Sequence, residues 1–312
     1  MARADHHGWH PAIGIGVSAT FGAVARAVST NRGLMSDPFA EPLVRAAGVE
    51  YFRRVVDNDR YAADDGDDPV TTGFIDLLAT HTRFLDEFVA EAGRAGLRQV
   101  VILGSALDTR PYRLWWPHRT TVFEIDRPEV LDFKSAVLRA LGARPSTNRC
   151  AVGIDLGQDW PAALRRVGFD TDAPTVWIAE QLLVGYLTPA EQDRLLHAVT
   201  LLSAPGSRLA ADHLPIWTPL QPAVERAFVD HWRQYGLDVD LACVTYPGEY
   251  RYVPEYLADD GWETVERDAA ELFAALGPAE LPRGGRDGMA AYVTATRAPG
   301  NTVAIGREIG WQ

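Results

Sequence analysis

The stretch from residue 100 to residue 113 reads VVILGSALDTRPYR and decides the fold class of this chain. Its first four residues are apolar and end at Gly104, which is the pattern of a buried strand that enters a tight turn. A dinucleotide-binding turn needs GxGxxG, so that a pyrophosphate can lie against the start of the next helix. Here Ala106 and Thr109 occupy the second and third glycine positions. The turn therefore disfavours a pyrophosphate cofactor and still suits a nucleoside without phosphates.

Short apolar runs alternate with helical segments from residue 98 onward. This alternation predicts βαβ units and a mostly parallel sheet that helices cover on both faces. Right-handed crossovers place the carboxyl ends of such strands at one edge of the sheet. The predicted strands are 100–103, 120–125, 150–154, 175–179, 207–211, 262–265 and 290–296, and the helices between them are 129–141, 160–167 and 189–202.

The first four predicted strands are followed by Gly104, Asp126, Asp155 and Glu180. Ligands bind at this edge in open α/β sheets, and an acidic residue after the second strand can accept both ribose hydroxyls. Asp155 and Leu156 could receive an adenine amino group and pack its ring, and Glu180 lies near the centre of the edge. A nucleoside that carries a positive sulfur and no phosphate suits these carboxylates. The edge therefore indicates S-adenosylmethionine as the cofactor.

The first 95 residues predict a helical extension in front of the α/β unit at 96–312, the two forming one structural unit. Residues 13–29 and 72–92 have helical periodicity, and Asp37-Pro38 predicts an N-cap followed by the first helical position. The polar stretch 57–68 contains six aspartates and predicts a solvated loop. A further insert at about 213–258 is rich in aromatic residues and predicts a lid.

Composition excludes several other classes. The chain has 30 basic and 42 acidic residues, a net charge of −12, and no basic run. Nucleic acid and anionic membrane surfaces are therefore disfavoured partners. Cys150 and Cys243 lie far apart and predict neither a disulfide scaffold nor a zinc site. We expect a cytoplasmic protein without a membrane span, a metal site or a secretory signal, and a monomer or weak dimer.

Several runs, in this order, resemble the leucine carboxyl methyltransferase family, and most of all its actinobacterial branch of S-adenosylmethionine-dependent methyltransferases. The resemblance spans roughly residues 15–300. It implies a class I methyltransferase fold: a Rossmann-like, seven-stranded, mostly parallel sheet with the last strand antiparallel, an N-terminal helical extension and a helical lid insert. The runs are SDPFAEPLV from residue 36, LGSALDTRPYRL from 103, VFEIDRPEVLDFK from 122, VGIDLGQDWPAAL from 152, PTVWIAEQLLVGYL from 174 and LSAPGSRLA from 202.

The resemblance also implies roles for residues of the cofactor site. Arg83, in THTRFLDEF, matches an arginine that holds the methionine carboxylate, and Arg26 stands where relatives carry a basic residue near that carboxylate. An arginine fork suits a carboxylate. The remaining implied contacts are Gly104 with the methionine part, Asp126 with the ribose, Asp155 and Leu156 with adenine, and Glu180 with the methionine amino group or sulfur.

The implied reaction is O-methylation of a carboxylate or hydroxyl on a small, partly apolar molecule. Trp217, Tyr186 and Tyr246 are the candidate lining of its pocket. A carboxylate needs no general base, whereas a hydroxyl does, and His213 is the candidate base.

The sequence departs from the family pattern at two glycines. Ala106 stands for the second glycine of LGxGLDTR, and Gln181 replaces the glycine of EGLLxYL, with one extra residue before Tyr186. These departures keep an alternative open, a non-catalytic methyltransferase-fold protein that binds S-adenosylmethionine or a related ligand. The missing glycines disfavour an NAD-dependent oxidoreductase.

Overall fold

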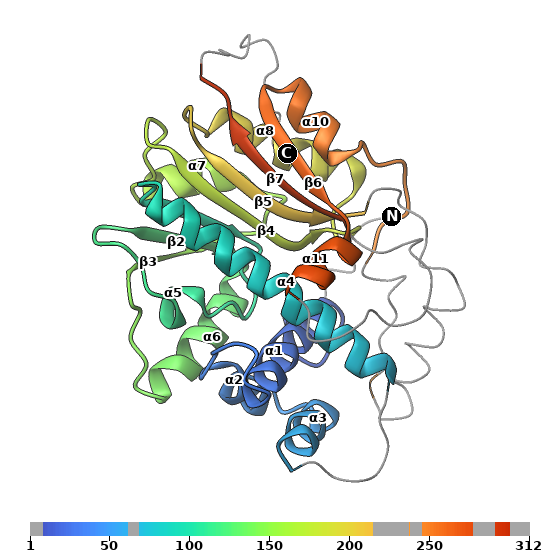
Figure 1. Ribbon diagram of the computed structural model, residues 1–312. Helices are drawn as coiled ribbons and strands as arrows, with labels where there is room; N and C mark the ends of the chain where they lie inside the picture. The colour runs from blue at the N-terminus through green and yellow to red at the C-terminus, as the bar shows by residue number, and fades with distance from the viewer. Residues whose placement is uncertain (1–8, 62–68, 215–236, 238–244, 277–290, 300–312) are drawn as a thin grey trace.

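The computed structural model describes residues 9–61, 69–214, 237, 245–276 and 291–299. Within them, seven strands form one sheet in the order β3-β2-β1-β4-β5-β7-β6 (Figure 1). β7 is antiparallel to both of its neighbours, and the other pairs are parallel. This topology confirms the predicted sheet and fold class. The strands are β1 Gln99–Leu103, β2 Thr121–Asp126, β3 Asn148–Gly153, β4 Thr175–Leu183, β5 Arg208–His213, β6 Trp262–Arg267 and β7 Ala291–Arg297.

Helices cover both faces of the sheet because its central strands alternate between two apolar cores. In β1, Val101 and Leu103 enter one core, and Val100 and Ile102 enter the other. The second core includes residues of the long helix α4, which crosses one face in Figure 1. Buried central strands of this kind read as continuous apolar runs. The helices from α4 onward are α4 Pro69–Arg94, α5 Arg110–Arg113, α6 Pro128–Ala140, α7 Trp160–Arg166, α8 Pro189–Leu201, α10 Val253–Asp259 and α11 Ala269–Leu276.

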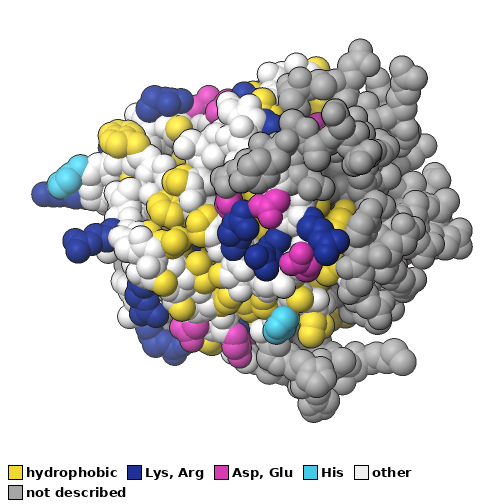
Figure 2. All heavy atoms as spheres, turned by 90° about the horizontal axis from the view of Figure 1, so that it is seen from below, with side chains coloured by type: hydrophobic (Ala, Val, Ile, Leu, Met, Phe, Trp, Pro, Cys, Tyr) yellow, Lys and Arg dark blue, Asp and Glu magenta, His cyan; other side chains and the backbone are white. Residues whose placement is uncertain are grey.

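Three N-terminal helices, α1 Ile15–Asn31, α2 Ala40–Ala47 and α3 Glu50–Tyr61, build a third core. Phe133 and Val137 of α6 pack against that core, which ties the extension to the α/β part. The face of the molecule that lies at the bottom of Figure 1 carries interspersed basic, acidic and apolar side chains (Figure 2), as expected for a solvated surface. None of the described helices is long and apolar enough to cross a bilayer.

The prediction of a loop that begins at residue 57 is wrong, because α3 continues to Tyr61. Phe52 and Val56 are buried on one face of this helix. Asp57 contributes from the outer face, where its carboxylate lies 2.5 Å from Arg45 of α2. A buried apolar face and this ion pair therefore outweigh the polar composition. Residues 62–68 lie outside the described part of the chain.

Asp37 is not the N-cap that the sequence predicts. The helix begins at Ala40, with Phe39 in the N-cap position. The carboxylate of Asp37, which is 1% exposed, accepts hydrogen bonds from Arg26 Nε at 2.9 Å, Thr109 Oγ1 at 2.6 Å and the Phe39 N–H at 3.2 Å. The carboxylate therefore links Arg26 of α1 to Thr109 in the turn after β1. These two hydrogen bonds hold it away from the N-cap position of α2.

Candidate functional site

The carboxyl ends of β1, β2 and β3 bring three predicted residues to adjacent positions. Leu103 pairs with Ile125, and Asp126 pairs with Gly153, so Gly104, Asp126 and Asp155 follow or end neighbouring strands. Gly104 has a φ of +61°, in the left-handed region that favours glycine. This edge of the sheet is the one at which α/β folds bind ligands.

Asp126 is fixed by backbone donors. Its Oδ2 accepts the N–H of Ala106 at 2.7 Å, and its Oδ1 accepts the N–H of Arg127 at 2.8 Å. Burial raises the pKa of Asp126, although both N–H groups oppose that change. Ala106 donates this bond with a φ of +41°, so the residue that replaces the family's glycine keeps a glycine-like backbone.

Asp155 and Leu156 form the turn after β3. Oδ1 of Asp155 accepts the N–H of Gly157 at 2.7 Å, which orders the turn, and Leu156 is half-buried against the core below. The two residues thus present a carboxylate beside an apolar side chain at the strand end.

Glu180 lies inside β4 and not after it, which corrects the predicted end of that strand at residue 179. The pairing of β4 with β5 shifts register between Ala179 and Leu183, and Gln181 has a φ of +50°. The N–H of Gln181 donates to Asp212 of β5 at 2.6 Å. The strand therefore continues through a bulge that Asp212 stabilises, and Glu180 lies at this bulge.

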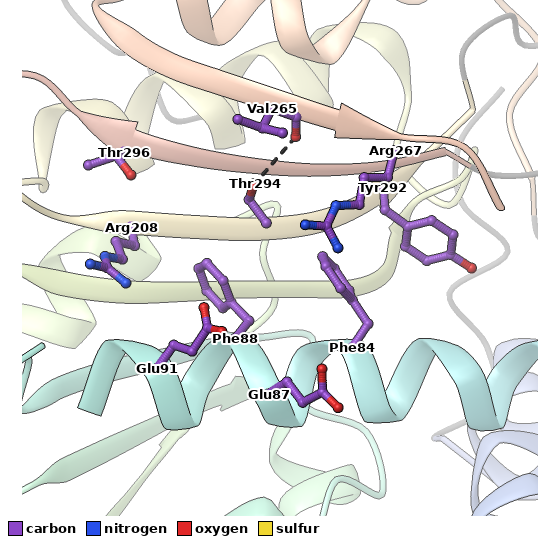
Figure 3. Close-up of a pocket in the computed structure, with 10 residues that line it drawn as sticks. All are labelled: Phe84, Glu87, Phe88, Glu91, Arg208, Val265, Arg267, Tyr292, Thr294 and Thr296. Atoms are coloured by element: carbon purple, nitrogen blue, oxygen red, sulfur yellow. Dashed lines mark hydrogen bonds between the residues drawn. The ribbon is translucent and has the colours of Figure 1, made fainter. Parts of the chain in front are cut away.

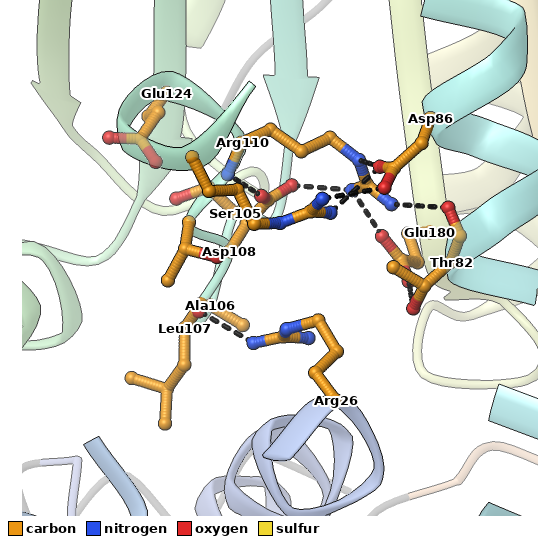
Figure 4. A network of polar contacts seen from close by, with 12 residues as sticks. Arg26, Thr82, Asp86, Ser105, Ala106, Leu107, Asp108, Arg110, Glu124 and Glu180 are labelled. Carbon is orange, nitrogen blue, oxygen red and sulfur yellow. Dashed lines mark hydrogen bonds and ion pairs between the residues drawn. The ribbon is translucent and has the colours of Figure 1, made fainter. Parts of the chain in front are cut away.

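Arg110 is the centre of the polar network around Glu180 (Figure 4). The guanidinium is 1% exposed and donates to Asp86 at 2.7 Å, to Asp108 at 2.6 Å and to Glu180 at 2.5 Å. A fourth, longer bond of 3.4 Å reaches the carbonyl of Thr82. One arginine therefore joins α4, the turn after β1 and the bulge of β4.

The charges of this network hold its carboxyl groups ionised. Burial would raise the pKa of Asp108, but Arg110, Lys134 and Arg26 lower it to about 2. Burial would likewise raise the pKa of Glu180, but the charges of Arg110, His81 and Arg26 together outweigh it, so that this pKa lies below its ordinary value. Both groups are therefore carboxylates at neutral pH.

The two arginines implied by the resemblance lie in different surroundings. Arg26 is buried and donates through Nη2 to the carbonyl of Leu107 at 2.7 Å, so it touches the turn after β1 (Figure 4). Arg83 directs its guanidinium to the carbonyl of Leu276 at the end of α11. Thr82, one residue earlier, faces Glu180 at 3.5 Å. The structure thus brings Arg26, but not the guanidinium of Arg83, to the network around Arg110.

Two of the three predicted pocket residues lie together. The hydroxyl of Tyr186 is 3.0 Å from that of Ser18, and burial raises the pKa of Tyr186. The N–H of Tyr246 donates to the carbonyl of Gly185 at 2.8 Å. Trp217 lies outside the described residues, as does most of the predicted lid at 213–258.

His213 faces away from Glu180. Its Nε2 lies 3.1 Å from a carboxylate oxygen of Glu266, and its ring stacks edge-on to Tyr252. Burial lowers its pKa. The preceding residue, Asp212, faces the opposite side of the sheet, where Nε2 of His81 approaches its carboxylate at 3.5 Å.

Side chains that the sequence analysis missed therefore complete the site. Arg110 and Asp108 belong to the LDTR run that carries the resemblance, so their position was signalled but their role was not. His81 and Asp212 had no such signal, because only folding brings α4 against β5. The described residues contain no group of three or more His, Cys, Asp or Glu side chains that could hold a metal ion.

Two cavities lie elsewhere. A cavity of about 200 Å³ separates α4 from β5, β6 and β7, where Glu87 and Glu91 stand opposite Arg208 and Arg267 (Figure 3). A second, shallow cavity of about 960 Å³ runs along the edge of the sheet at which the parallel strands begin. Gln99, the first residue of β1, is among the residues that line it. The charges of the first balance, and the second lies at the edge away from the carboxylates, so neither is our candidate site.

The sheet order, the antiparallel β7 and the acidic strand ends define a class I methyltransferase fold. The family model described as "Leucine carboxyl methyltransferase" matches residues 19–200. A relative from Mycobacterium avium is 64% identical over 289 residues, covering 91% of this chain and 98% of the relative. One from Mycobacterium marinum is 46% identical over 96% of this chain and 99% of its own. Both are named "Putative S-adenosyl-L-methionine-dependent methyltransferase".

The chain belongs to the leucine carboxyl methyltransferase family. The family predicted from the sequence is thereby confirmed, and the class of S-adenosylmethionine-dependent methyltransferases with it. Among solved structures, a duf574 family protein of Streptomyces avermitilis gives a TM-score of 0.47 at 14% identity, over 88% of this chain and 96% of that one. Magnesium protoporphyrin IX methyltransferase of Synechocystis with bound S-adenosylmethionine gives 0.42 at 14% identity, over 77% and 88%.

Proposed function

We propose that this protein transfers the methyl group of S-adenosylmethionine to a carboxylate or hydroxyl oxygen of a small, partly apolar molecule. One observation supports the proposal most strongly. In a chain of this family, Gly104, Asp126 and Asp155 meet at the carboxyl edge of the sheet, and Glu180 lies on the next strand along it. A pocket for a cationic nucleoside needs this combination of an open turn and ionised carboxylates.

The residues present fit the cofactor. Asp126 would hold the ribose hydroxyls, Asp155 and Leu156 the adenine, and Gly104 the methionine part, where a backbone without a side chain allows close approach. Glu180 is 15% exposed in its side chain and is ionised, so it can face the ammonium or sulfonium group. When bound, the cofactor supplies an electrophilic methyl group.

The chain's own contribution to the reaction is orientation. The acceptor oxygen must lie in line with the bond that breaks, and holding it there removes much of the entropic cost. Arg26 joins α1 to the turn after β1, and Tyr186 of the β4–α8 connection is bonded to Ser18 of α1. We therefore place the N-terminal extension over the cofactor site, where it would exclude water from the acceptor.

The acceptor oxygen decides whether a base is needed. A carboxylate is already ionised at neutral pH and needs none. For a hydroxyl, the buried pair of His81 and Asp212 is a second candidate, because His81 lies 3.5 Å from Asp212 and acts on the charge of Glu180, whereas His213 is paired with Glu266. His213 remains the base named from the sequence, and a comparison of His81→Gln with His213→Gln would separate the two.

Calorimetric titration with S-adenosylmethionine and S-adenosylhomocysteine tests the proposal. We expect binding by the wild type and a loss of at least about tenfold in Asp126→Ala, because about 1.4 kcal/mol of interaction is a factor of ten. Asp170→Ala is the matched control, since Asp170 lies at the opposite edge of the sheet. Formation of S-adenosylhomocysteine with a panel of carboxylic acids and phenols then tests transfer. Binding without transfer to any of them would favour the non-catalytic alternative.

A further inference from the structure

The network in Figure 4 gives one residue a role that no motif assigns. We infer that Arg110 is a positioning residue that holds Glu180 as a fixed carboxylate at the pocket, so that the site meets a cationic ligand with a full negative charge. The inference rests on the proposed function, since it takes the cation to be S-adenosylmethionine.

The position of Arg110 is determined from both ends. Its backbone carbonyl accepts Nε1–H of Trp116 at 3.0 Å, and its backbone N–H donates to Asp108 Oδ1 at 2.7 Å. The other oxygen of Asp108 accepts Nη1 at 2.6 Å, and Asp86 accepts Nε at 2.7 Å. These two aspartates orient the guanidinium plane, and Nη1 then reaches Glu180 at 2.5 Å.

The exposed fractions of Arg110 and Glu180 indicate from which side the arginine approaches the carboxylate. The side chain of Arg110 is 1% exposed, whereas that of Glu180 is 15% exposed. Arg110 therefore approaches Glu180 from the protein interior and leaves part of the carboxylate open. An arginine that lay on the open side would instead compete with the ligand.

The groups that face Glu180 from other elements do not replace Arg110. Asp108 adds a like charge from the turn after β1, and Asp212 adds another from β5. His81 of α4 and Arg26 of α1 also lower the pKa of Glu180, but each has a smaller effect than Arg110. Without Arg110, burial and two neighbouring carboxylates would favour protonation of Glu180.

Titration calorimetry with S-adenosylmethionine on the full chain, between about pH 5.5 and 7.5, tests the inference. In the wild type we expect affinity that changes little, because the pKa of Glu180 lies below its ordinary value. In Arg110→Met, each pH unit below the raised pKa of Glu180 should weaken binding about tenfold. Glu180→Gln should bind weakly at every pH, because it has no carboxyl group to titrate.

Arg113→Met is the matched control. Arg113 is buried in the same short helix and pairs with Asp86 at 2.6 Å and with Asp37 at 3.7 Å. Its removal should leave the pH profile flat, as should Arg110→Lys, which keeps the charge. A flat profile in Arg110→Met, or the same decline in Arg113→Met, would overturn the inference. If Arg110→Met does not fold, Arg110→Lys decides, because a pH-dependent loss of binding in a variant that keeps the charge contradicts the role assigned to that charge.

A measurement without ligand separates failure of this inference from failure of the proposed function. If the folded wild type binds no S-adenosylmethionine at about 1 mM, the proposed function fails. The urea midpoints of Arg110→Met and of Arg110→Met/Glu180→Gln over the same pH range still test Arg110. We expect the single variant to gain more stability as the pH falls, because its folded state takes up a proton at Glu180. Parallel midpoints would overturn the inference.

Discussion

Ala106→Gly should stabilise this protein. Ala106 has a φ of +41°, and the family pattern has glycine there. A left-handed backbone costs an L-residue about 1–2 kcal/mol, whereas the extra freedom of glycine in the unfolded chain costs about 0.4–1 kcal/mol. The difference leaves a net gain of about 0.5–1 kcal/mol for glycine. The bond from residue 106 to Asp126 is retained, because it uses the backbone N–H.

Differential scanning calorimetry can measure this gain. An unfolding entropy of about 2.1 cal/mol/K per residue predicts a rise in Tm of about 1 °C for a chain of 312 residues. The urea midpoint should rise with an unchanged m-value, because the surface exposed on unfolding is the same. Binding of S-adenosylmethionine should be retained or tightened, since the change removes a methyl group beside the pocket.

Ala173→Gly is the control for this reasoning. Ala173 is half-buried in a connection and does not have a positive φ. Glycine there should therefore destabilise the protein by about 0.4–1 kcal/mol. A fall in Tm for both variants would refute the argument, because it would mean that the backbone at residue 106 carries no strain that glycine relieves.

Three other perturbations have directions set by the structure. Lys134→Met should lower the free energy of unfolding by about 1–3 kcal/mol, measured in urea, because Lys134 Nζ lies 2.6 Å from the fully buried Glu124, which keeps its ion pair with Arg149. The pKa of Asp108, about 2 against an ordinary 3.8, makes a contribution of about 2 kcal/mol that is present above about pH 4 and lost as the pH falls toward 2; Asp108→Asn should lose stability less steeply over that range. Gly104→Ala should cost about 1–2 kcal/mol, because φ is +61°, and should weaken S-adenosylmethionine in calorimetry.

The sheet could be predicted because burial on both faces gives each central strand a continuous apolar sequence. The predicted strand ends agree with the structure to within two residues, except in β4. There the sequence turns polar at Glu180, which is the usual sign of a strand end, but Asp212 binds the N–H of Gln181 and the strand continues. That bond joins residues 31 positions apart, so no local pattern could reveal it.

The site could be predicted only where the strand order determines it. Gly104, Asp126 and Asp155 follow from the parallel register, which periodicity gives. The positions of the Arg83 and Arg110 side chains could not be predicted in this way. Successive residues of a helix point about 100° apart, and the sequence does not say which position of α4 faces the sheet. Thr82 takes that position, and an arginine from another element supplies the charge.

The charges at the carboxyl edge do not balance, and the imbalance suits the proposed cofactor. Around this edge, the carboxylates of Asp37, Asp86, Asp108, Asp126, Glu180 and Asp212 lie near the guanidinium groups of Arg26, Arg110 and Arg113, and the charges of Lys134 and Arg127 act on Asp108 or Asp126. The three guanidinium groups are neutralised by the carboxylates with which they form ion pairs. Asp126 and Asp212 instead accept hydrogen bonds from backbone N–H groups. A ligand with a positive sulfur relieves this surplus, whereas its neutral thioether product relieves less. In the proposed site, transfer of the methyl group would therefore remove part of the attraction for the cofactor and favour release of the product.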